Sequence, residues 1–120
     1  MSVTSIIAPW TYCPSLTRYE RWKTRAVRIG DIGIGGNNPI RVQSMTTTDT
    51  MDTAGTVAQS IRMIEAGCEL VRITAPSKKE AENLAEIKKQ LKAAGFNTPL
   101  VADIHFTPNA AEIAARIVEK

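Results

Sequence analysis

The chain has 120 residues, of which 43% are apolar and 22% charged, and its formal net charge is +3. This composition is that of a globular protein with one modest core, and it excludes a disordered or fibrous chain. Apolar runs are only a few residues long, whereas a membrane-spanning helix needs about 20 residues, so we expect no transmembrane segment. The amino terminus lacks the basic and apolar stretches of a signal peptide, which predicts a cytoplasmic protein.

Cysteines and basic residues give no clear site. Cys13 and Cys68 are too far apart in the sequence for a metal-binding pair, and we interpret Cys68 as a small buried side chain. Basic residues gather around Tyr19 and Trp22, but no nucleic-acid motif accompanies them, so we expect a solvated face and no nucleic-acid partner. These basic residues are Arg18, Arg21, Lys23, Arg25 and Arg28.

The first segments of the chain differ in pattern. Residues 1–23 show no sustained period and are expected to form an amino-terminal arm. Residues 24–29 alternate polar and apolar side chains, Gly30 and Asp31 mark a turn, and Ile32 and Ile34 resume the alternation, which predicts a β-hairpin.

Three short apolar segments then recur at a regular interval, each followed by a helical pattern. With Val42, Val71 and Val101 as reference points, the intervals are 29 and 30 residues. Repeats of this kind predict parallel strands joined by helices in right-handed crossovers. The predicted buried strands are Ile40–Ser44, Leu70–Thr74 and Leu100–Ile104.

The three helices have recognisable starts and stops. Ser77 and Glu80 have the spacing of a capping box, and Pro108 suits a first helical position. The helices are expected to run from Asp52 or Thr53 to Gly67, from Ser77 to Gly95, and from Thr107 to the end of the chain. Their predicted inward residues are Val57, Ile61 and Ile64, then Ala81, Leu84, Ile87 and Leu91, then Ile113 and Ile117.

The fold class predicted is α/β, the first part of a TIM-type (β/α)₈ barrel. Such a barrel takes about 250 residues, so residues 24–120 would hold the hairpin and roughly three of the eight units. A flavodoxin-like open sheet is the rival architecture, but its first strand should lead into a short phosphate-binding turn. Here the segment 43–50 is long and contains no glycine, which favours the partial barrel.

Polar residues close the predicted strands at the edge where α/β folds bind ligands. Strand alternation places Arg72 on the side opposite Val71, and Asp103 and His105 on the side opposite Ile104. A guanidinium at this place suits phosphate or carboxylate recognition, and an ion pair between Arg72 and Asp103 is an equally good structural explanation.

Asp103 and His105 can act as acid and base, bind substrate hydroxyls or ligate a metal, although two ligands do not make a metal site. The hydroxyl and amide groups of Gln43, Ser44 and Thr46, at the end of the first strand, would suit a diphosphate or polyol. Ser and Thr at such places also bond their own backbone, which is the alternative.

The sequence resembles the 4-hydroxy-3-methylbut-2-enyl diphosphate synthases over roughly residues 18–120. Residues 12–13, 78–81 and 96–99 look most like the long, three-domain form of that family. The motifs that carry the resemblance are Lys23–Gly36, Pro39–Thr46, Thr56–Ala58, Ala66–Gly67, Leu70–Thr74 and Pro99–Phe106.

The resemblance implies an iron–sulfur oxidoreductase of non-mevalonate isoprenoid biosynthesis. Such enzymes convert 2-C-methyl-D-erythritol 2,4-cyclodiphosphate with two electrons delivered through a [4Fe-4S] cluster, from a donor such as ferredoxin or flavodoxin, and we expect a homodimer when complete. It implies phosphate contact for Arg72, substrate contact for Asp103 and His105, and a pocket lined by Gln43, Ser44 and Thr46.

The family's cluster ligands lie in a carboxy-terminal domain that this sequence does not contain, so no metal ligand is predicted here and the fragment alone is expected to be inactive. Two other hypotheses stay open. One is a different phosphate- or pterin-binding barrel enzyme. The other is a noncatalytic module that binds a partner through an exposed barrel edge.

Overall fold

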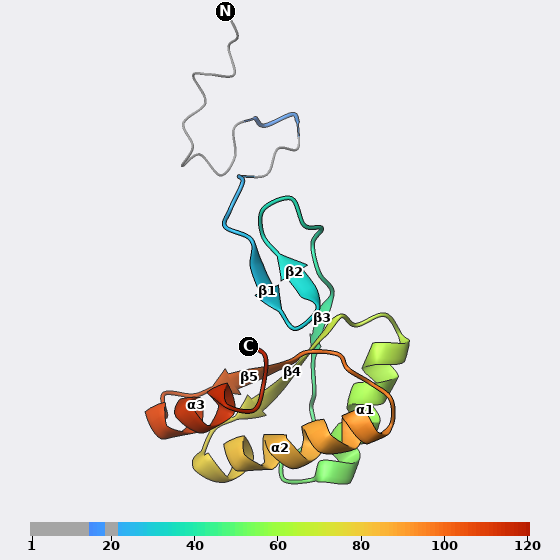
Figure 1. Ribbon diagram of the computed structural model, residues 1–120, viewed down its shortest axis with the longest axis vertical. Helices are drawn as coiled ribbons and strands as arrows, with labels where there is room; N and C mark the ends of the chain where they lie inside the picture. The colour runs from blue at the N-terminus through green and yellow to red at the C-terminus, as the bar shows by residue number, and fades with distance from the viewer. Residues whose placement is uncertain (1–14, 19–21) are drawn as a thin grey trace, which may run out of the picture.

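A hairpin followed by three strand–helix units forms the described part of the chain, residues 15–18 and 22–120 of the computed structural model (Figure 1). Cys13 and most of the predicted arm lie outside these residues. The elements in chain order are β1 (Val27–Ile29), β2 (Ile32–Ile34), β3 (Gln43–Met45), α1 (Thr53–Glu65), β4 (Leu70–Ala75), α2 (Lys78–Ala93), β5 (Leu100–Ile104) and α3 (Pro108–Ala115).

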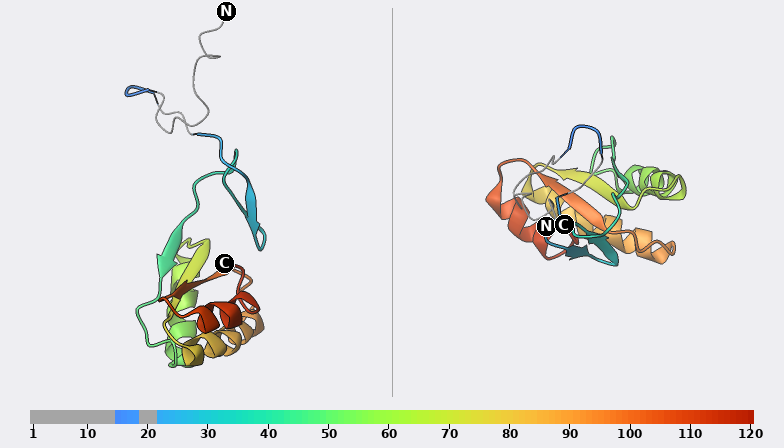
Figure 2. Two further views of the ribbon diagram at one scale, coloured as in Figure 1. Left: turned by 90° about the vertical axis from the view of Figure 1, so that its left-hand side faces the viewer. Right: turned by 90° about the horizontal axis from the view of Figure 1, so that it is seen from above.

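The three later strands form one parallel sheet in the order β3-β4-β5. Each connection runs through a helix, because parallel neighbours cannot be joined by a tight turn. The described residues form no closed barrel, and the sheet is open beyond β3 (Figure 2). The predicted parallel strand–helix pattern is therefore confirmed.

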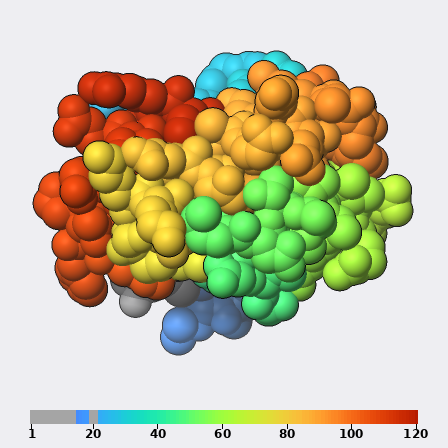
Figure 3. Space-filling model, turned by 90° about the horizontal axis from the view of Figure 1, so that it is seen from below, coloured from blue at the N-terminus to red at the C-terminus, as the bar shows by residue number. Residues whose placement is uncertain are grey.

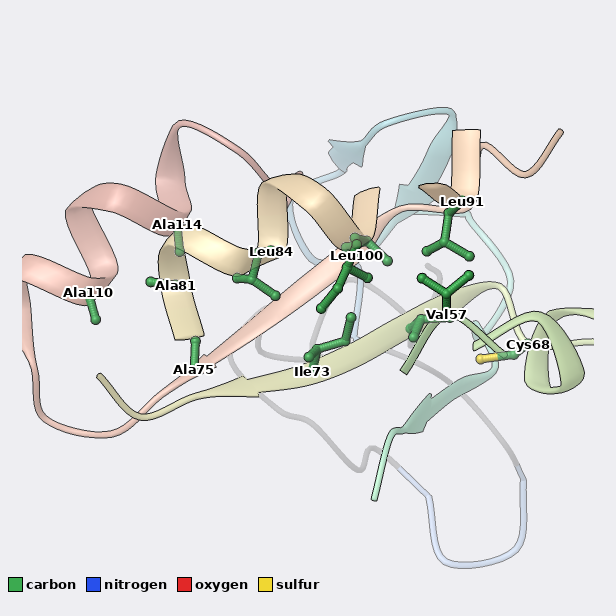
Figure 4. Close-up of a cluster of buried hydrophobic side chains, with 12 residues drawn as sticks. Val57, Cys68, Ile73, Ala75, Ala81, Leu84, Leu91, Leu100, Ala110 and Ala114 are labelled. Atoms are coloured by element: carbon green, nitrogen blue, oxygen red, sulfur yellow. The ribbon is translucent and has the colours of Figure 1, made fainter. Parts of the chain in front are cut away.

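The main core lies between this sheet and the helices. Val71 and Ile73 of β4 are fully buried, and they pack in one cluster with Leu84 and Ile87 of α2 (Figure 4). Each such side chain, once buried, contributes about 1.5 to 3 kcal/mol to folding. All four residues predicted on the inner face of α2 are buried, as expected.

The hairpin covers the other face of the sheet at its amino-terminal end. Ile29 of β1 and Ile34 of β2 pack on Leu70 and Val101, the first inward-facing residues of β4 and β5. Strand alternation places later residues of β4 and β5 on this same face, nearer the carboxyl ends of the strands. The hairpin does not cover that part of the face.

Helix ends largely follow the predicted signals. The Asp52 side chain accepts a hydrogen bond from the Gly55 amide, 3.0 Å away, and so caps α1. Gly67 and Gly95 follow the last turns of α1 and α2 with φ of +109° and +91°, a conformation that favours glycine. The capping box at Ser77 is wrong in detail, because its hydroxyl donates to the Glu80 carboxylate instead of accepting from the backbone.

The first predicted buried strand differs from the prediction. β3 begins at Gln43 instead of Ile40, and the exposed fractions of Ile40 and Val42 are 74% and 56%. Within the described residues no strand pairs with the outer edge of β3, and these exposed apolar side chains lie beside that open edge. The Val42 carbonyl still accepts from the Leu70 amide at 3.2 Å, which keeps the segment beside β4.

The last helix also ends earlier than predicted, at Ala115. The chain then turns back to the sheet. The Lys120 amide donates to the Leu100 carbonyl at 3.2 Å, and the Ala102 amide donates to the Lys120 carbonyl at 2.8 Å. This is the parallel pattern that places Lys120 opposite Val101. The end of the chain therefore lies along the outer edge of β5.

No helix in the part of the chain that the structure describes combines the length and apolar character needed to cross a bilayer.

Candidate functional site

The side chains of the candidate site lie on the uncovered face of the sheet, at its carboxyl edge. Thr74 of β4 lies opposite Asp103 of β5, and Arg72 lies opposite Val101 one layer below. Paired residues of parallel strands point to the same side, and Val71 and Ile73 point to the helices. Arg72, Thr74 and Asp103 therefore form a row on the face of the sheet that points away from the helices, the inward row.

Arg72 and Asp103 form an ion pair across the two strands. The distance from Arg72 Nη2 to Asp103 Oδ1 is 2.9 Å, and the exposed fractions of the two side chains are 41% and 18%. The hydrogen bond from Arg72 and a second one from His105 lower the pKa of the Asp103 carboxyl. The carboxylate is consequently ionised at neutral pH. Arg72 Nε is buried and has no hydrogen-bond partner.

His105 follows β5 and joins the row through Asp103. Its Nε2 lies 3.2 Å from Asp103 Oδ2, and 51% of its side chain is exposed. A carboxylate only accepts hydrogen bonds, so Nε2 carries a proton and donates it. In the neutral ring, Nδ1 is then the free acceptor.

Thr74 is a neighbour of His105 that the sequence did not single out. Its Oγ1 lies 3.5 Å from His105 Nε2. Strand alternation predicts that Thr74 lies on the same side of its strand as Arg72, and this signal could have identified it. The register with Asp103 brings it within reach of the imidazole.

The structure separates the three candidate residues at the first strand. Gln43 lies opposite Leu70 and so faces inward, whereas Ser44 lies opposite Val71 and faces the helix side. Thr46 is 5% exposed and its amide donates to the Arg72 carbonyl, which places its side chain on the helix side as well. Its Oγ1 is buried without a partner. Ser44 and Thr46 are therefore not brought to the inward row.

Polar groups in the segment between β3 and α1 form hydrogen bonds with side chains of α1. The Thr47 amide donates to Gln59 Oε1 at 2.9 Å, and the Thr48 and Thr56 hydroxyls are 2.7 Å apart. This loop, green in Figure 3, lies beside the start of α2, where Asn83 donates to the Thr50 carbonyl. These bonds hold the segment after β3 against α1 and α2.

The described residues do not form a cluster or metal site. Within residues 15–18 and 22–120, no three His, Cys, Asp or Glu side chains are arranged to share a metal ion. Cys68 is buried, and its Sγ donates to the Leu70 carbonyl at 2.8 Å. No reaction step is therefore assigned to an iron–sulfur cluster or metal ion held by these residues.

A family model described as the GcpE TIM-barrel domain matches residues 24–120. The chain belongs to this family. Membership agrees with the strand–helix units and the parallel sheet, which form the first part of such a barrel. It also explains why the sheet has an open edge, because a closed barrel needs strands beyond those described.

Curated relatives from several bacteria carry one printed name, 4-hydroxy-3-methylbut-2-en-1-yl diphosphate synthase (flavodoxin). The chain is 54% identical over 110 residues to the protein of Akkermansia muciniphila, covering 92% of this chain and 19% of the relative. It is 60% identical over 102 residues to that of Parabacteroides distasonis, covering 85% and 17%. It is 55% identical over 102 residues to that of Leptospira interrogans, covering 85% of this chain and 15% of the relative. The chain thus spans less than a fifth of the length of these relatives.

Proposed function

We propose that the chain is the amino-terminal part of the substrate-binding barrel of a 4-hydroxy-3-methylbut-2-enyl diphosphate synthase, an oxidoreductase of isoprenoid biosynthesis. The observation that carries the proposal is the convergence of Arg72, Asp103 and His105 at the carboxyl edge of the sheet. This is the edge where barrel enzymes bind their ligands. The relatives' printed name supplies the activity.

Arg72 would bind the diphosphate of the substrate. A guanidinium offers several N–H donors in a planar fork, which matches the oxygens of a phosphate group. Asp103 accepts a hydrogen bond from one of these N–H groups. An entering phosphate would replace the carboxylate as acceptor. The partial exposure of Arg72 leaves room for this exchange.

Asp103 and His105 would contact the non-phosphate part of 2-C-methyl-D-erythritol 2,4-cyclodiphosphate. With Nε2 bound to Asp103, His105 presents Nδ1 to a substrate hydroxyl. Asp103 both orients the ring and supplies a second acceptor. Gln43 faces inward and can add an amide contact. Ser44 and Thr46 remain weaker candidates, because their register directs them to the helices.

The reaction also needs groups outside this chain. A [4Fe-4S] cluster bound by a further domain would supply two electrons, and the relatives' printed name favours flavodoxin over ferredoxin as the donor. A homodimer and a cytoplasmic location remain predictions. The 120-residue chain alone should not turn over substrate, because it supplies only part of the site.

The test uses the longer protein that carries this chain, with its cluster reconstituted. Wild-type protein should convert the cyclodiphosphate with reduced flavodoxin. Replacing Arg72 with Ala should weaken substrate binding roughly 10- to 150-fold, the equivalent of a charge-assisted hydrogen bond. Arg116→Ala is the matched control, because Arg116 is exposed, lies just after α3 and forms an ion pair with Glu112 of that helix.

Absence of conversion by the wild-type protein would refute the proposed activity. Unchanged kinetics in Arg72→Ala, with conversion intact, would remove Arg72 from the site. Tight binding of a pterin without conversion of the cyclodiphosphate would favour the alternative barrel enzyme.

A further inference from the structure

We infer that Thr74 is a positioning residue that holds the His105 imidazole from the neighbouring strand. Thr74 Oγ1 lies 3.5 Å from His105 Nε2, the same nitrogen that Asp103 Oδ2 approaches at 3.2 Å. Two oxygens from two strands thus face one N–H group, and Nδ1 is left for the ligand. This inference rests on the proposed function of the site.

The need for a second contact follows from the exposure of His105. About half of the ring is exposed, and it lies just beyond the last residue of β5. A ring held by one hydrogen bond can swing about that bond, whereas a second contact on another strand restricts it. Catalytic groups must keep their orientation within about 10 to 20° to be effective.

Thr74 is itself held in place from the side of the helices. The Thr50 hydroxyl donates to the Thr74 carbonyl at 2.6 Å, and Thr50 is 2% exposed. The Thr50 carbonyl in turn accepts from Asn83 of α2 at 2.8 Å. Threonine is β-branched, so few side-chain rotamers are open to it once its backbone is fixed. The hydroxyl therefore has a defined position relative to the imidazole.

A positioning role separates Thr74 from Arg72. Loss of Arg72 should weaken binding of the diphosphate, whereas loss of the Thr74 hydroxyl should disturb only the orientation of His105. The expected signature is a fall in kcat with little change in KM. Serine keeps the hydroxyl and should retain most of the function.

The experiment compares Thr74→Val and Thr74→Ser in the longer protein with its cluster reconstituted. Thr74→Val should lower kcat roughly 10-fold, since small misplacements of a catalytic group are costly, and should leave KM near the wild-type value. Thr74→Ser should stay near wild type. Thr98→Val is the matched control, because Thr98 precedes β5 at the end of the strand away from His105.

A second measurement does not depend on turnover. In the longer protein the His105 imidazole resonances, assigned by their loss in His105→Gln, report the mobility of this ring directly. The ring order parameter should fall in Thr74→Val and not in Thr74→Ser. If Thr74→Val does not fold, Thr74→Ala serves in the same comparisons.

Several results would overturn the inference. They are an unchanged kcat and ring mobility in Thr74→Val, a rise in KM alone, and a Thr74→Ser variant as impaired as Thr74→Val. If the proposed function is wrong, the wild-type protein will not convert the cyclodiphosphate. The ring measurement will still show whether Thr74 holds His105.

Discussion

Arg72 and Asp103 form their 2.9 Å ion pair although they do not lie opposite each other in the sheet. Arg72 lies opposite Val101, and Asp103 lies opposite Thr74, one layer nearer the carboxyl edge. The guanidinium therefore reaches toward the carboxyl edge of the sheet and is held there by a carboxylate. An entering anion has to compete with that carboxylate.

This competition predicts a gain of affinity when Asp103 is neutralised. In the longer protein, Asp103→Asn should bind inorganic diphosphate several-fold more tightly, because a negative charge next to Arg72 is removed. Turnover of the cyclodiphosphate should nevertheless fall, because His105 Nε2 loses its charged carboxylate acceptor. Calorimetry with diphosphate measures the first effect, and Glu112→Gln on α3 is the control. Weaker diphosphate binding in Asp103→Asn would show that Asp103 does not compete for Arg72.

The lowered pKa of Asp103 predicts how acid affects stability. In the unfolded chain this carboxyl titrates near its ordinary pKa of about 3.9, and in the folded chain at a lower pH. A group of this kind stabilises the fold above the unfolded-state pKa, and the contribution disappears as the pH falls through the folded-state pKa. The difference in free energy of unfolding between wild type and Asp103→Asn should thus be constant near neutrality and shrink below about pH 4.

Urea unfolding in dilute solution at a series of pH values measures this difference. Other carboxyls with lowered pKa, such as Glu69 beside Val42 and Arg41, contribute equally to both proteins and cancel. A wild-type advantage that persists at low pH would contradict the assignment to Asp103.

Gly35 should tolerate no side chain. Its φ is +80°, and an added Cβ would collide with the carbonyl oxygen of Arg25. Gly35→Ala should lower the free energy of unfolding by more than about 1 kcal/mol, the usual cost of this backbone conformation alone. Gly67→Ala is the control, because Gly67 has φ of +109° and nothing within 4 Å of such a Cβ. Equal losses in both variants, measured by thermal unfolding, would argue against the collision.

The isolated chain should self-associate through the uncovered edge of its sheet. Ile40 and Val42 lie there exposed, and unpaired strand edges favour intermolecular contacts. Sedimentation velocity should show association that grows with concentration and that Ile40→Lys with Val42→Lys reduces. Leu16→Lys is the control, because Leu16 is apolar and even more exposed but precedes the hairpin. A strictly monomeric wild-type chain at all concentrations would refute the prediction.

Local patterns were sufficient for much of the fold and part of the site. Helix positions, the glycines that end α1 and α2, and the inward direction of Arg72 and Asp103 depend on residues near in sequence. Alternation along a strand and periodicity along a helix are properties of a single segment. For this reason the sequence by itself determined the strand–helix order and the sides of β4 and β5 that face the helices.

Only the tertiary structure decided what depends on neighbouring strands. The register of β3 against β4 directs Ser44 toward the helices, and the open edge of β3 leaves Ile40 and Val42 exposed. Likewise, the meeting of Thr74 with His105 and the return of Lys120 to β5 depend on which residues lie opposite one another. A shift of one residue in register would turn each side chain to the opposite face of the sheet. A single segment carries no information about the register of its partner.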